Sequence, residues 1–119
     1  MQLDAGQQEY YARHLLLDGF GGEGQERLLA ATVQVRGEGA AALWCARYLA
    51  ASGVGRLAVD VAAWTDELRG LGPWLTVEVR VVQPVQVVPP DAPGPAGSAM
   101  NGARAAIEVV RAIARGTAA

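Results

Sequence analysis

The sequence predicts a small α/β domain of the Rossmann type, with three layers and a short, mainly parallel sheet. Residues 32–36 alternate as a strand does, and residues 56–60 form a second such run. Between them lie a glycine-rich turn and an apolar, alanine-rich helical segment at residues 43–51. A strand, a tight turn, a buried helix and a strand open a βαβ unit, so we expect parallel strands joined by a right-handed crossover. The length of 119 residues suits a single domain, here residues 1–119.

The rest of the chain adds elements on both sides of this unit. Helical periods at residues 7–17 and 22–31 precede it, the second with Leu28 and Leu29 turned inward. A short helix at residues 64–71 and a third strand at residues 75–81 follow, and residues 85–88 extend or pair with that strand. Residues 89–98 hold four prolines and two glycines, which predicts a loop. The final helix is expected at about residues 99–115.

That final helix has two sequence faces. One face is an apolar stripe made of Ala103, Ala106, Ile107, Val110, Ile113 and Ala114. The other face carries charged residues at i,i+3 and i,i+4 spacing, which predicts ion pairs among Arg104, Glu108, Arg111 and Arg115.

The strands themselves carry polar residues where a sheet covered on both faces should be apolar. Gln34 and Arg36 interrupt the first strand, and Thr76, Glu78 and Arg80 share one side of the third. We therefore expect one sheet face to meet water or a partner subunit.

Composition excludes several function classes. All ten basic residues are arginines, so mechanisms that need a lysine, such as a Schiff base or a P-loop, are excluded. The net charge of −2, with arginines spread along the chain, argues against nucleic acid as a partner. The single cysteine, Cys45, excludes an internal disulfide and a four-cysteine zinc site. Without a signal peptide or a long apolar run, we expect a cytoplasmic protein with no membrane partner.

The turn at residues 37–42 matches the dinucleotide-binding pattern G-x-G-x-x-A through Gly37, Gly39 and Ala42. Asp60 follows at the distance of a ribose-binding carboxylate. Glycines let the backbone approach a phosphate, and the helix N-terminus supplies free N–H groups. Two interpretations stay open: a cofactor-binding turn, or a tight turn that serves only helix–strand packing, which the carboxylate of Glu38 inside the turn favours.

Four short blocks resemble the ThiF/MoeB/HesA family, the bacterial relatives of ubiquitin-activating enzymes. They are YARHLLL at residues 11–17, GQERLL at 24–29, the strand with its glycine turn, and YLAASGVG at 48–55. The resemblance covers about residues 7–60, and residues 97–116 resemble a helix near the end of the family's adenylation domain. The chain between these parts is much shorter than in the family.

The resemblance implies a fold that binds MgATP at the glycine turn, adenylates a ubiquitin-like sulfur carrier and works as a dimer. Arg13 matches an arginine that reaches the partner subunit's ATP phosphates, Gly37 and Gly39 match the turn glycines, and Asp60 resembles the ribose-binding aspartate. The chain departs from the family where Ala40 and Ala42 replace glycines. The family's Asn-Leu-x-Arg-Gln block, its lysine, its magnesium-binding aspartate and its Cys-x-x-Cys pairs have no counterparts.

Each single residue also has a plain structural interpretation. Arg13 suits a solvated helix arginine as well as a phosphate ligand, and His14 beside a leucine run suits a packing role. Cys45 is expected to be a buried hydrophobe. The three tryptophans are expected to anchor the core or an interface: Trp44, Trp64 and Trp74.

Three functions are compatible with these residues. The first is a non-catalytic subunit, without cofactor, that binds or scaffolds as a homodimer, or with a full-length adenylating enzyme or a ubiquitin-like carrier protein. The second is an adenylyltransferase-type component that holds ATP at the glycine turn, with Arg13 acting across a dimer. The third is a small NAD-binding module, which rests only on the turn and Asp60.

Overall fold

The computed structural model describes residues 22–72, 74–79 and 85–116. The predicted first helix, with Arg13 and His14, lies outside these residues. The described elements are α2 (Gly22–Ala30), β1 (Thr32–Val35), α3 (Ala40–Ser52), β2 (Arg56–Val59), a 3-10 turn (Ala62–Trp64), α4 (Thr65–Leu71), β3 (Thr76–Val79), β4 (Val85–Val87) and α5 (Pro95–Arg115). Their order is the α/β order that the sequence predicts.

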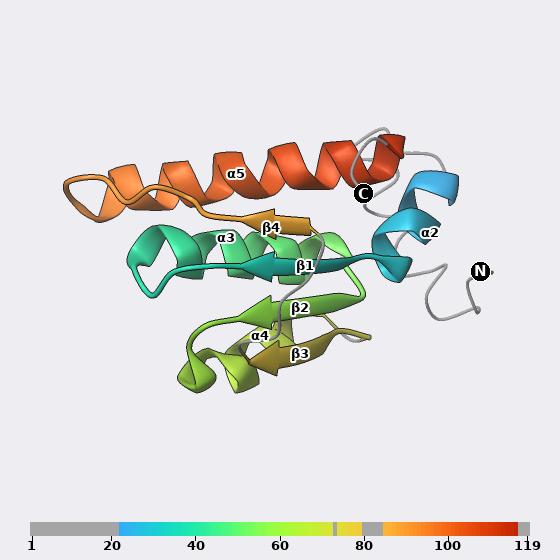
Figure 1. Ribbon diagram of the computed structural model, residues 1–119, viewed down its shortest axis with the longest axis horizontal. Helices are drawn as coiled ribbons and strands as arrows, with labels where there is room; N and C mark the ends of the chain where they lie inside the picture. The colour runs from blue at the N-terminus through green and yellow to red at the C-terminus, as the bar shows by residue number, and fades with distance from the viewer. Residues whose placement is uncertain (1–21, 73, 80–84, 117–119) are drawn as a thin grey trace.

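The four strands form one parallel sheet in the order β3-β2-β1-β4 (Figure 1). β1 pairs with β2 in the register Val33 to Leu57, as a βαβ unit requires. The prediction that residues 85–88 extend or pair with the third strand is wrong, because β4 pairs with β1 at the opposite edge. A strand of three residues carries too little pattern to specify such a non-local neighbour.

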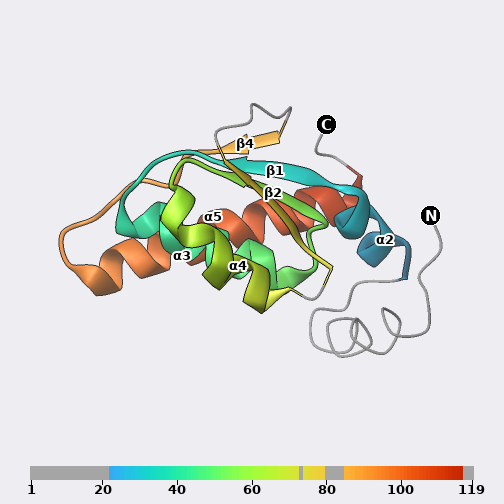
Figure 2. The same cartoon turned by 90° about the horizontal axis from the view of Figure 1, so that it is seen from below.

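The helices α3, α4 and α5 lie on one face of the sheet (Figure 2). Alternate strand residues point into this layer, and Val33, Val35, Leu57 and Val59 are fully buried there. The described residues thus form two layers, a sheet and a helical layer, and the third layer that the sequence predicts is not seen among them. The polar strand residues Gln34, Glu78 and Gln86 share the other face by register, although Gln34 is only 5% exposed.

The contact between α3 and α5 joins the two halves of the chain. Gly102 makes the approach possible, because a Cβ at this position would overlap the carbonyl oxygen of Ala41 and come within 2.8 Å of the Cys45 nitrogen. The close contact between α3 and α5 at Gly102 determines which face of α5 is buried. Ser98, Gly102, Ala106, Val110, Ile113 and Ala114 face inward.

Two predictions about α5 are therefore wrong. The apolar stripe was expected to include Ile107, but this side chain is 45% exposed because the contact line through Gly102 turns it outward. The helix also begins earlier than predicted, at Pro95 rather than residue 99. Proline is tolerated there because the first residues of a helix have no N–H partner within the helix.

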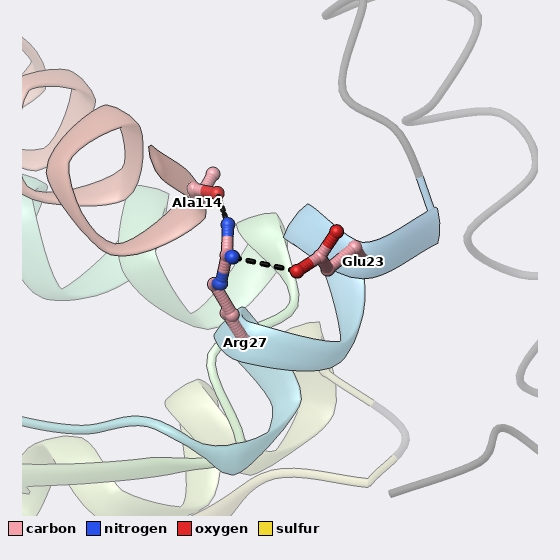
Figure 3. A network of polar contacts seen from close by, with 3 residues as sticks. All are labelled: Glu23, Arg27 and Ala114. Atoms are coloured by element: carbon pink, nitrogen blue, oxygen red, sulfur yellow. Dashed lines mark hydrogen bonds and ion pairs between the residues drawn. The ribbon is translucent and has the colours of Figure 1, made fainter. Parts of the chain in front are cut away.

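The helix α2 lies at the amino ends of the strands, beside the end of α5 (Figure 1). Arg27 links the two helices: its Nη1 donates to the Ala114 carbonyl oxygen at 2.7 Å, and its Nη2 donates to Glu23 at 2.7 Å (Figure 3). Carbonyls in the last turn of a helix lack partners within the helix, so Arg27 caps α5. None of the helices in the described ranges is both long and apolar enough to cross a membrane.

Candidate functional site

The glycine turn follows β1 at the carboxyl edge of the sheet. Gly37 has a φ of 116°, in the left-handed region that side chains other than glycine adopt only with strain. Its N–H donates to Oδ2 of Asp60 at 2.9 Å. Asp60 directly follows β2, the neighbour of β1, so parallel pairing brings this carboxylate to the turn. The bond fixes the backbone at the entry to α3.

The N-terminus of α3 receives a second carboxylate from a distant part of the chain. The N-cap residue, Gly39, makes no side-chain cap of its own. Instead, the N–H of Ala41 donates to Oδ1 of Asp91 at 2.9 Å. Asp91 lies in the loop after β4, and β4 lies beside β1, which brings this loop over the turn. A carboxylate at this end of a helix is also favoured by the helix dipole.

Gly39 is the residue that allows Asp91 to come so close. A Cβ at position 39 would overlap the carboxylate of Asp91. The second glycine of the pattern therefore does what it does in a nucleotide-binding turn, which is to let an anion approach bare backbone. In this chain the anion is the protein's own side chain.

The loop that carries Asp91 is held by the first turns of α5. The Ser98 hydroxyl donates to the Ala92 carbonyl at 3.0 Å and accepts the Ala92 N–H at 3.1 Å. Asn101 donates from Nδ2 to the Pro90 carbonyl at 2.9 Å. Ser98 is 4% exposed and its two bonds are partly buried, whereas the Asn101 bond is exposed to water. The position of Asp91 is thus supported from both sides along the loop.

In this arrangement, the Asp91 carboxylate occupies part of the place where an ATP phosphate would approach the turn. The phosphate would need the α3 N–H groups, and Asp91 already occupies the N–H of Ala41. The carboxylate would also bring a like charge against the phosphate oxygens, which is unfavourable at short range. Asp60 is likewise engaged with Gly37. The turn keeps the geometry of an anion-binding site, and the protein's own Asp91 carboxylate occupies it.

The predicted site residues divide into three groups. Gly37, Gly39 and Asp60 lie together at the turn, and their predicted role in binding a cofactor stays a prediction. Ala42 is 3% exposed and packs in the core beneath it. Arg13 lies outside the described residues. Sequence reasoning missed Asp91, whose only signal is an acidic residue shortly after a strand; its role depends on β4 lying beside β1.

Cys45 has no features of a reactive thiol. It is fully buried in the core, and burial raises the pKa of its thiol from 9.0 to about 12. The prediction of a buried hydrophobe is confirmed. Within the described ranges, no group of three or more His, Cys, Asp or Glu residues is arranged to hold a metal ion.

The tryptophans are half-buried rather than central to the core. Arg47 lies over the Trp44 ring, with its guanidinium carbon 4.8 Å from the ring centroid, and also binds Glu67 of α4 at 2.7 Å. Trp64 packs against the edge of the core. These contacts anchor α3 and α4 to each other.

Over up to half of its length, the chain is similar in sequence to curated proteins that include an activating enzyme and an adenylyltransferase. Over 59 residues, half of this chain, it is 48% identical to the SAMP-activating enzyme E1 of Haloferax volcanii. Over 49 residues it is 53% identical to the vegetative HesA protein of Trichormus variabilis and 51% identical to the adenylyltransferase and sulfurtransferase MOCS3-1 of Zea mays. These segments make up 22%, 18% and 10% of the three relatives, so the chain matches about a fifth of their length or less.

The fold has a solved counterpart. The structure of TcdA (CsdL) covers 84% of this chain with a TM-score of 0.62, while 54% of that structure is covered. Its sequence identity of 15% supports a shared fold only. No family model matches the chain. The curated relatives nonetheless agree with the motif blocks, and they confirm the resemblance to the ThiF/MoeB/HesA family over the half of this chain that they match.

Proposed function

We propose that this domain acts without catalysis, as a binding or scaffold unit with the fold of an adenylating enzyme. It would act as a homodimer, or together with a full-length adenylating enzyme or a ubiquitin-like carrier protein. The observation that carries the proposal is the bond between Asp91 and the N–H of Ala41, which puts a fixed negative charge where a nucleotide phosphate would bind.

The sequence supports the same proposal. The family's lysine is missing, because the chain has no lysine at all. Lysine and arginine differ in the shape and placement of their charge on a phosphate, so another residue type does not simply substitute. Ala40 and Ala42 also stand where the family has glycines. Loss of the phosphate site and loss of the family's basic residue are consistent with a domain that keeps the fold and not the reaction.

The competing function is an adenylyltransferase-type component that binds ATP at the turn, with Arg13 acting across a dimer. Its support is the identity of 48% with an activating enzyme in the segment that the two proteins share. This function requires the Asp91 loop to move away from α3 when nucleotide arrives. The two candidates therefore differ in whether the wild-type chain binds ATP.

Calorimetric titration of the full chain with MgATP, with AMP and NAD as controls, separates them. We expect no binding at ligand concentrations up to about 1 mM, where a typical weak site would still be detected. The variant Asp91→Ala is titrated as well, because it leaves the N–H of Ala41 at the α3 N-terminus without its carboxylate acceptor. Micromolar ATP binding by the wild-type chain would overturn the non-catalytic proposal, and a loss of that binding in Arg13→Ala would establish the competing one.

A further inference from the structure

The outward flank of α5 carries a row of arginines beside exposed apolar side chains. Met100 is 63% exposed and Ile107 is 45% exposed. With 3.6 residues per turn, these two side chains and three exposed arginines fall within an arc of about 80° on the helix. The arginines are Arg104, Arg111 and Arg115. We call this set the α5 flank.

The predicted ion pairs on this helix do not form. Within the described part of the chain, no ion pair or side-chain hydrogen bond reaches the three arginines of the α5 flank, although Glu108 lies one turn from two of them. Four other arginines do pair with carboxylates: Arg27, Arg47, Arg56 and Arg69. Among the described residues, the α5 flank therefore carries three positive charges beside the single carboxylate of Glu108, along about 16 Å of helix.

We propose that the α5 flank is a docking surface for an acidic segment of another protein, one that also carries aliphatic side chains. The inference rests on the proposal that this domain works by binding. Guanidinium groups recognise carboxylates through paired hydrogen bonds, and the charge on the flank favours an acidic partner. Met100 and Ile107 supply the apolar contact that such a helix-face interaction needs.

A second copy of this chain is a poorer occupant than a different protein. Most carboxylates of the described residues already have partners: Glu23, Asp66, Glu67 and Glu78 are in ion pairs, and Asp60 and Asp91 bind backbone N–H groups. Docking of a copy through these residues would break those contacts, which leaves Glu26, Glu38 and Glu108 as the described carboxylates that a copy could offer without doing so. An acidic segment from a different protein brings carboxylates that have no such prior partners.

The test uses the full chain and two synthetic helical peptides of about 16 residues. One peptide presents glutamates and leucines on one face, and the other replaces each glutamate by glutamine. Binding is followed by backbone amide shifts and by calorimetry. We expect the acidic peptide to bind at least tenfold more tightly than its neutral counterpart, with shifts along α5 and a clear loss of affinity as salt rises.

The variants identify the surface. The triple change Arg104→Gln, Arg111→Gln and Arg115→Gln should weaken the acidic peptide at least tenfold, while the same three positions changed to lysine should retain part of the affinity. Glutamine is a good helix former, so α5 is expected to stay folded. Arg36→Gln is the matched control, because Arg36 is exposed at the end of β1 and away from α5. Ile107→Gln should weaken both peptides.

Several results would overturn the inference. They are equal binding of the two peptides, no binding of either, or an unchanged affinity in the triple glutamine variant. Self-association that disappears in the triple variant would assign the surface to a second copy instead. None of these outcomes depends on nucleotide, so a failure here is distinguishable from ATP binding, which would overturn the proposed function.

Discussion

The two ends of the sheet differ in how completely their polar groups are paired. At the carboxyl edge, Asp60 and Asp91 bind backbone N–H groups of the glycine turn, and Ser98 and Asn101 hold the loop. At the amino edge, the side chain of Gln25 in α2 is completely buried, and neither its Oε1 nor its Nε2 has a hydrogen-bond partner among the residues that the structure describes. At the carboxyl edge, where ligands bind in open parallel α/β sheets, the chain's own side chains thus bind the free backbone N–H groups.

The largest expected effect comes from the helix that serves both ends. α5 supplies Ser98 to the loop at the carboxyl edge and the Ala114 carbonyl to Arg27 at the amino edge. Gly102→Val would drive side-chain atoms into Ala41 and Cys45 of α3. We expect a loss of about 3 kcal/mol in the free energy of unfolding, measured by urea denaturation. Gly70→Ala is the control, because nothing lies within 4 Å of a Cβ at that position.

Replacing the unpaired glutamine should stabilise the protein. Gln25→Met keeps a similar shape and removes a buried amide that has no partner, which should raise the unfolding free energy by about 1–2 kcal/mol. Gln34→Met is the matched control at a glutamine that is 5% exposed and has interactions of its own. It should lose stability, and a loss of similar size at Gln25 would contradict the contrast between the two edges.

Removing the Asp91 carboxylate from the turn should change the free energy of unfolding by less than the substitutions at Gly102 and Gln25. Asp91→Ala leaves the N–H of Ala41 without its acceptor, which resembles the loss of a helix N-cap and is expected to cost about 1 kcal/mol. The comparison is Asp66→Ala, at an aspartate whose side chain is 98% exposed and pairs with Arg69. This substitution should change the free energy of unfolding by a few tenths of a kcal/mol at most. Equal denaturation midpoints for the two variants would mean that the Asp91 bond contributes nothing.

The amino edge offers a smaller effect through Arg27. Arg27→Met removes the bond to the Ala114 carbonyl and keeps an apolar stem, with an expected loss of about 0.5–1 kcal/mol. Glu23→Ala removes only the exposed ion pair, worth about 0.3–0.5 kcal/mol. Thermal denaturation of both variants compares the two contacts, and a larger loss in Glu23→Ala would argue against the cap on α5.

Near neutral pH, ionisation of the Cys45 thiol in the core is expected to have the smallest effect on stability. Cys45 is protonated there in both the folded and the unfolded chain, so it adds no pH dependence. Above pH 9.0 the unfolded thiol ionises while the folded one, with its pKa raised to about 12, does not, so stability should fall as pH rises through this range. Denaturation of the wild-type chain and of Cys45→Ala at increasing pH measures the difference, which vanishes if the thiol is exposed.

The fold was predictable where its signals are local. Alternation at residues 32–36 and 56–60 and the glycine turn between them specify a βαβ unit, which the structure contains. The position of β4 was not predictable, because the pairing partner of a short parallel strand depends on contacts far along the chain. The role of Asp91 could not be predicted for the same reason. Ala106, Val110, Ile113 and Ala114 face inward as predicted, whereas Ile107 was wrongly included because the approach at Gly102 depends on the partner helix.

The parallel packing of α3 and α5 also has a consequence for synthesis. The face of α3 around Ala41 and Cys45 is covered by Gly102 and its neighbours, which are encoded about half a chain later. While the ribosome adds the intervening residues, this apolar face has no partner, and a nascent chain with such a face is prone to aggregation. Folding of the domain is therefore expected to complete only after α5 has emerged, which makes its yield sensitive to chaperones that shield a half-made core.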